Sequence, residues 1–113
     1  KIARFFPVTL NGRSQKYHPI WDAMLDNNHL WTYREYQEQL DRFTEEQMAE
    51  MAAGTPVGWV RENAGRCRII YEWAKEGDAL GRPFINKAYP LAEEQMLRAS
   101  YRLAGLLNDI FSE

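Results

Sequence analysis

One short segment combines residue types whose spacing could serve chemistry: Tyr17-His18-Pro19-Ile20-Trp21-Asp22. Pro19 suits the first position of a helix, and Asp22 follows His18 by four residues, so the imidazole and the carboxylate would share one helix face. Zinc accepts imidazole nitrogen and carboxylate oxygen at about 2.0–2.2 Å, so the pair could hold one cation. Spacing alone also allows a structural interpretation, in which His18 caps the helix and Asp22 balances its dipole.

Other residues give weaker indications of chemistry. His29 is expected in a surface loop, and Cys67, the single cysteine, is expected as a small core residue. A lone cysteine excludes an internal disulfide and a zinc site built only of thiolates. The sequence contains neither a glycine-rich phosphate loop nor a serine or cysteine in a recognisable nucleophile motif. The aromatic side chains of Trp31, Tyr33 and Tyr36 could stack on bases, although core packing is the simpler interpretation.

The segments around these residues predict a mostly helical chain. Asn11-Gly12 indicates a turn, with a small hairpin, near the start. Two capping boxes, which begin at Thr32 and Thr44, predict helices over about 33–41 and 45–53. Thr55 and Pro56 then begin a long helix that we expect to reach about Glu76, followed by a loop over 78–87.

A last helix over about 90–111 is predicted by an apolar face with helical spacing, which comprises Met96, Ala99, Leu103, Leu106, Leu107 and Ile110. Such a face must pack against a partner helix. The expected architecture is therefore an all-α helical bundle, entered through a short extended segment, that forms a single domain over residues 1–113. Glu62 and Arg102 lie among apolar positions of the two long helices, which predicts a structural ion pair between them.

Composition limits the possible partners and surroundings. The 113 residues carry a formal net charge of −2 and a sequence pI near 5.7, which gives no sign of a basic surface that would wrap duplex DNA. No apolar run is long enough for a membrane span, and the opening segment is broken too early by Pro7 to be a signal peptide. The absence of an initiator methionine suggests a processed or truncated start.

Two later segments give the His18–Asp22 motif a context: Trp59-Val60-Arg61-Glu62-Asn63 and the stretch from Glu94 to Asn108 that contains Arg102-Leu103-Ala104-Gly105-Leu106-Leu107-Asn108. Taken in this order, the three segments resemble the zinc-dependent single-strand nuclease and 3′-nucleotidase family of the S-one/P-one type. The resemblance covers about residues 11 to 111, which would be the C-terminal portion of such an enzyme.

The resemblance implies a mostly helical fold shared with the zinc-dependent bacterial phospholipases C, a site of three zinc ions, and His18 and Asp22 as two of the zinc ligands. It also implies single-stranded nucleic acid or 3′-nucleotides as substrates, and it favours a secreted or periplasmic location. Several positions depart from the family pattern without removing a ligand, namely Lys16, Tyr17, Val60, Asn63 and Ser100.

The family's other metal ligands have no counterpart in these residues, so this chain alone is not expected to cut nucleic acid. The expected partner is the missing N-terminal half of the same protein. Two explanations stay open, a fragment of a complete enzyme and a naturally short, non-catalytic relative. Two other functions also stay open, a phospholipase C-like hydrolase and a helical interaction domain without metal.

Overall fold

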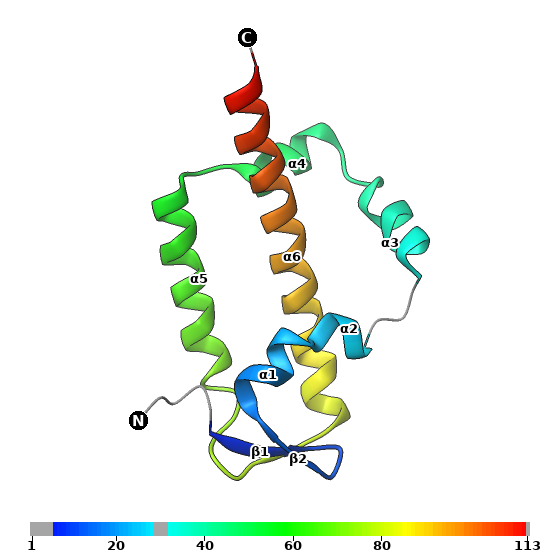
Figure 1. Cartoon of the computed structure of the whole chain (residues 1–113), viewed down its shortest axis with the longest axis vertical. Coiled ribbons are helices and arrows are strands. Elements are labelled where there is room, and N and C mark those ends of the chain that lie inside the picture. The colour runs from blue at the N-terminus through cyan, green and yellow to red at the C-terminus, as the bar shows by residue number, and fades with distance from the viewer. Residues whose placement is uncertain (1–5, 29–31, 113) are drawn as a thin grey trace.

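A computed structural model describes residues 6–28 and 32–112 of the chain. The chain forms a small sheet at one end, from which helices extend along a long axis of 53 Å (Figure 1). In chain order the elements are β1 (Pro7–Leu10), β2 (Arg13–Lys16), α1 (Tyr17–Asp22), α2 (Met24–Asn28), α3 (Tyr33–Leu40), α4 (Glu45–Ala52), α5 (Pro56–Ile70), β3 (Ala79–Leu80) and α6 (Arg82–Phe111). The predicted all-α helical class is confirmed.

The predicted hairpin is confirmed, and it belongs to a three-stranded sheet. β1 and β2 pair antiparallel around Asn11 and Gly12, which have φ values of 51° and 83°. Asparagine and glycine tolerate this left-handed region better than other residues, which explains the turn. β3 adds to β1 in parallel, with Leu10 beside Leu80, so the strand order is β2-β1-β3. A two-residue strand has too few residues to show a period, and the sequence did not indicate it.

The three helix starts that were predicted from capping residues are confirmed. At Thr32 and at Thr44 the side-chain oxygen accepts from the third helical N–H, while the Glu35 or Gln47 side chain accepts from the capping residue's own N–H. At α5 the Thr55 side chain accepts from the Gly58 N–H, and Pro56 takes the first helical position. Local side-chain chemistry is sufficient to fix these starts because each bond satisfies an N–H that the helix leaves free.

Both long helices differ from their predicted bounds at the end near the sheet. α5 ends at Ile70 rather than near Glu76. Ala74 lies in the connection that follows, where it is buried in the apolar core and does not extend the helix. α6 begins at Arg82, so the predicted loop over 78–87 is wrong from that residue onward. Phe84, Ile85 and Ala88 are buried at helical spacing there, and this burial offsets the lost hydrogen bond at Pro90 inside the helix.

The apolar core lies at the sheet end of the molecule. Its buried members come from the hairpin, the first two helices, the connection after α5 and the start of α6: Val8, Tyr17, Ile20, Met24, Ala74, Phe84, Ile85 and Ala88. The Tyr17 ring is at its centre, stacked on Phe6 at 5.0 Å between centroids and edge-on to Tyr71 at 5.4 Å. The Tyr17 hydroxyl donates a hydrogen bond to the Ile70 carbonyl, which ties α1 to the end of α5.

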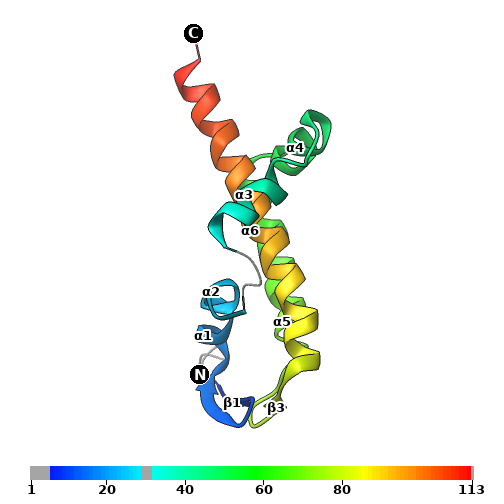
Figure 2. The same ribbon diagram turned by 90° about the vertical axis from the view of Figure 1, so that its right-hand side faces the viewer.

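The second half of α6 extends away from this core (Figure 2). α4 packs on one side of it, and Phe43, in the connection before α4, meets Tyr101 with ring centroids 6.4 Å apart. Among the described residues, the apolar face that was expected to meet a partner helix is largely exposed, including Met96, Leu103, Leu107 and Ile110. None of the described helices is long and apolar enough to cross a membrane.

Candidate metal centre and adjoining groove

His18 and Asp22 lie on one face of α1, as their spacing predicts. The helix begins at Tyr17, whose buried ring fixes the rotation of α1 and leaves the other face toward solvent. The predicted place of Pro19 at the first helical position is therefore wrong: His18 is the second helical residue, one turn before Asp22, and Pro19 is the third. Pro19 still removes no helical hydrogen bond, because the first four N–H groups of a helix have no partner within it.

The alternative interpretation of this pair, as helix cap and dipole partner, does not fit the structure. Lys16 occupies the N-cap position, and no side chain caps this helix start. Asp22 is the last residue of α1, at the negative end of the helix dipole, where a carboxylate is not stabilised. In the structure the two side chains contact each other directly, one turn apart on α1.

The distance between the two side chains suits a shared cation. His18 Nε2 lies 3.2 Å from Asp22 Oδ2, and the side chains are 36% and 68% exposed. Two ligands of a tetrahedral zinc ion, each about 2.0–2.1 Å from the metal, lie about 3.3 Å apart. The two side chains therefore fit two positions of such a site. No group of three or more potential ligands occurs within residues 6–28 and 32–112, so a metal site at this pair would need ligands from outside the described residues.

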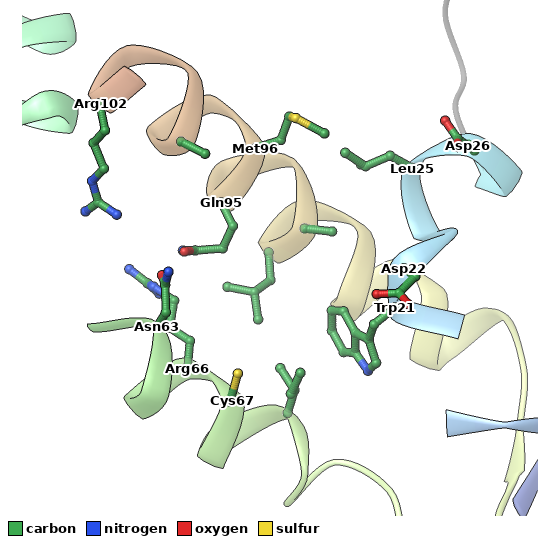
Figure 3. A pocket seen from close by; sticks show the side chains of 14 residues that line it. Trp21, Asp22, Leu25, Asp26, Asn63, Arg66, Cys67, Gln95, Met96 and Arg102 are labelled. Carbon is green, nitrogen blue, oxygen red and sulfur yellow. The ribbon is translucent and has the colours of Figure 1, made fainter. Parts of the chain in front are cut away.

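A groove of about 540 Å³ opens beside Asp22 (Figure 3). Its floor is α6, and its walls are the α1–α2 segment on one side and α5 on the other. Most of the lining is apolar, including Leu25, Ile70, Ala92 and Met96. The groove brings the candidate metal pair next to a surface that is able to receive a bound molecule or a polypeptide segment.

Trp21 positions the α1 wall of this groove. Its ring is edge-on to Tyr17 at 6.3 Å and to Phe84 at 5.9 Å, so it rests on the buried core. Because the packing of Trp21 fixes the backbone at this point, it also fixes the position of the next residue, Asp22, at the edge of the groove. Asp26, one turn further on, also lines the groove. Its spacing of four residues from Asp22 is the one sequence signal for this position.

Glu62 and Arg102 form the ion pair that was proposed from the sequence. Arg102 Nη2 donates to Glu62 Oε2 at 2.7 Å, and Arg102 is 7% exposed. Partial burial acts to raise the pKa of Glu62, but the hydrogen bond from Arg102 and the charges of Arg102, Arg98 and Arg66 outweigh it and hold that pKa below its ordinary value. The structural role assigned to the pair stays a prediction until stability is measured.

Further ion pairs extend this contact along the two helices. Arg66 Nη2 lies 3.6 Å from Glu62 Oε1 and 3.7 Å from Glu94 Oε1, and Glu94 also receives a hydrogen bond of 3.1 Å from Arg98 Nε. The Arg102 guanidinium lies 5.3 Å from the centroid of the Trp59 ring. α5 and α6 are therefore connected through long charged side chains, with the groove open between them (Figure 3).

Three other candidates from the sequence have different outcomes. Cys67 is exposed and lines the groove, so its expected place in the core is wrong. Its helix, α5, ends at Ile70 and has no buried residue, so the apolar side of α5 borders the groove and not the core. Tyr33 is 91% exposed and Tyr36 is half-buried, so core packing fails for Tyr33. His29 and Trp31 lie outside the described residues.

Comparisons with known proteins agree with this helical chain. The family model described as S1/P1 Nuclease matches residues 5–112. Endonuclease 3 of Arabidopsis thaliana is 28% identical over 113 aligned positions, which cover 84% of this chain and 38% of that relative. The chain thus spans well under half the length of the curated relative that it matches. No solved structure matches it at a significant level. Because the family match extends over nearly the whole sequence, this chain belongs to the S1/P1 nuclease family.

Proposed function

We propose that this chain supplies one wall of a zinc-dependent phosphodiesterase site that cleaves single-stranded DNA and RNA, with 3′-nucleotides as further substrates. The observation that carries this proposal is the placement of His18 Nε2 and Asp22 Oδ2, 3.2 Å apart on one helix face at the edge of an open groove. Family membership supports the nuclease class, and a curated relative is named an endonuclease.

In this proposal His18 and Asp22 hold zinc, and the remaining ligands for a site of three ions come from the part of a family-length protein that this chain does not match. Zinc, when bound, supplies the Lewis acidity that activates water for attack on phosphorus. His18 must present Nε2 unprotonated, and Asp22 must be ionised, since both act as lone-pair donors. The chain alone, with two ligands, is not expected to catalyse hydrolysis.

The test is made in a family-length protein that carries this segment. His18→Ala and Asp22→Asn should each lower bound zinc, measured by elemental analysis, and lower cleavage of single-stranded DNA in parallel. Helix content by circular dichroism should stay nearly the same, because both side chains lie on the solvent side of α1. Full zinc occupancy in His18→Ala would refute the assignment.

Asp26→Asn is the matched control, because it removes the same charge from the same wall of the groove. It should retain zinc and activity, and a loss equal to that of Asp22→Asn would show a general electrostatic effect in place of ligation. Parallel assays on phosphatidylcholine and on single-stranded DNA separate the nuclease from a phospholipase C-like hydrolase. Absence of zinc from the family-length protein would favour an interaction domain without metal.

A further inference from the structure

A second pocket, of about 350 Å³, lies at the sheet end, between the hairpin and the end of α2. Figure 1 shows the turn of the hairpin and the end of α2 on the same side of the molecule. Its floor is apolar and is formed by Leu10 of β1 and Ile20 of α1. The rest of its lining is polar and comprises Asn11, Arg13, Gln15, Asn27 and Asn28. Among the described residues, none lines both this pocket and the groove beside Asp22, so the two are separate.

Two polar side chains of β2 reach the pocket from the face of the hairpin that continues the core. Side chains alternate along a strand, so Arg13 and Gln15 share one face of β2. Arg13 lies opposite Leu10 in the register, and Gln15 lies opposite Val8, which is buried in the core. Apolar side chains at positions 13 and 15 would extend that core. The chain instead has a guanidinium and an amide there, and such exceptions to the apolar pattern are expected at functional sites.

The polar lining has the chemistry of an oxyanion site. The Arg13 guanidinium presents five N–H donors, and each of the four side-chain amides presents two more. Asn28 Nδ2 donates to the Met24 carbonyl at 2.9 Å, which holds this amide in place. None of the described residues that line the pocket is an aspartate or a glutamate, so no carboxylate there repels an anion. Arginine, asparagine and glutamine are among the side chains that bind phosphate oxygens.

The shape of the pocket favours the phosphate and sugar of a nucleic acid strand over its base. No aromatic side chain occurs among the described residues of the lining, so a base would find no ring on which to stack. Leu10 and Ile20 can pack against a sugar while the polar side chains reach the phosphate oxygens. The volume lies near the lower end of the range of about 300–1,000 Å³ that small ligands occupy.

Helix α1 separates this pocket from the candidate metal pair. Ile20 lies two residues from both His18 and Asp22, which places it about 160° around the helix from each. A helix with its side chains is about 10–12 Å across, so a strand that passes around α1 can contact both places. We infer that the pocket binds a phosphodiester of single-stranded nucleic acid, away from the bond that is cleaved. The choice of nucleic acid rests on the proposed function, whereas the pocket itself needs no zinc.

The test uses this chain, labelled with nitrogen-15 and kept in EDTA so that metal plays no part. One probe is a thymidine tetranucleotide without terminal phosphates, and the other is its methylphosphonate analogue, which has the same bases and sugars but no backbone charge. In NMR titrations the first should shift the Arg13 Nε–H signal and the side-chain amide signals of Asn11, Gln15, Asn27 and Asn28. The second should leave them in place, because the bound group is the charged phosphate.

Arg13→Ala should weaken binding of the tetranucleotide about tenfold or more, and it should lower the slope of log Kd against log salt by about 0.7. Lys16→Ala is the matched control, because it removes the same charge from an exposed position on the opposite face of the same strand. It should change the affinity less than about threefold. A second variant, Asn27→Asp, places a carboxylate at the pocket from the other wall and should also weaken binding about tenfold or more.

Three results would overturn the inference. Equal weakening by Arg13→Ala and Lys16→Ala would mean attraction to net charge alone, and equal binding of the methylphosphonate analogue would exclude phosphate as the bound group. Inorganic phosphate that binds as tightly as the tetranucleotide would assign the pocket to the free ion and not to a strand. Zinc binding by His18 and Asp22 is measured separately, so failure at this pocket is distinguishable from failure of the proposed nuclease function.

Discussion

The two ends of this molecule are stabilised by different forces. At the sheet end, apolar and aromatic side chains from the hairpin, α1, α2 and the start of α6 are buried together. At the far end, where α4, the start of α5 and the second half of α6 lie (Figure 1), Arg102 is the one side chain that is buried among the described residues. Ion pairs connect α5 to α6 there, while a row of apolar side chains on α6 is exposed.

This difference indicates which part of the fold is self-sufficient. Apolar burial stabilises without needing a partner of exact orientation, so the sheet end can hold its structure within this chain. Ion pairs that are partly open to solvent contribute less, since water screens them and their side chains lose freedom. The far end therefore has less apolar burial to stabilise it, and the candidate metal pair lies on α1, at the sheet end.

The largest effect is expected at the sheet end, from Tyr17→Ala. The Tyr17 ring is fully buried and contacts Phe6, Tyr71 and Phe84. Its removal should lower the free energy of unfolding by about 3–5 kcal/mol, through lost burial and the cavity left behind. Chemical denaturation followed by circular dichroism measures this change.

Tyr17→Phe is the control for that result. It keeps the ring and removes only the hydroxyl that donates to the Ile70 carbonyl, so the expected loss is about 1–2 kcal/mol. If Tyr17→Ala cost no more than Tyr17→Phe, the aromatic cluster would not be what stabilises the sheet end, and the comparison of the two ends would fail.

The next largest effect is expected at the far end, from Arg102→Ala. This change leaves Glu62 half-buried without its 2.7 Å partner and removes the cation above the Trp59 ring. The free energy of unfolding should fall by about 3 kcal/mol, at the lower bound for breaking a buried pair because Glu62 retains some exposure. An unchanged melting temperature would contradict the structural role of the pair. Arg61→Ala, at an exposed position of α5 beside Glu62, should change little.

A smaller effect is expected from acid. The pKa of Glu62 lies below its ordinary value of 4.5 in the folded chain, so the unfolded chain binds more protons as the pH falls through this range. Stability from this group is complete above about pH 4.5 and is lost as the pH falls through the folded pKa. Urea unfolding between about pH 6 and 3 should show this loss, and Glu62→Gln should reduce it.

The features that local chemistry determines could be predicted from the sequence. The capping boxes at Thr32 and Thr44, the Thr55–Pro56 start and the Asn11-Gly12 turn each depend on a few neighbouring residues, and each is confirmed. The shared face of His18 and Asp22 follows from helix geometry in the same way. Their role as zinc ligands came from resemblance and stays a prediction.

The features that depend on distant contacts could not be predicted. Ala74 keeps helical spacing with Ile70 but lies in the connection after α5, because it packs against core residues that are distant in the sequence. The early start of α6 depends on Phe84 and Ile85 packing against the hairpin, which no local signal shows. Periodicity indicated the apolar face of α6 but not what covers it, because a pattern describes one surface and not its partner.

The smallest effect is expected from Leu103→Ala, made in this chain alone. Leu103 is exposed, so its truncation removes little buried area, and alanine has a slightly higher helix propensity than leucine. The free energy of unfolding should change by less than about 0.5 kcal/mol. Ile85→Ala, on the same helix but buried, should cost about 2–5 kcal/mol under the same conditions. A loss at Leu103 close to that at Ile85 would mean that the apolar face of α6 is already packed within the chain, because only a buried leucine can cost so much. In that case the far end would be as self-sufficient as the sheet end, and the contrast between the two ends would fail.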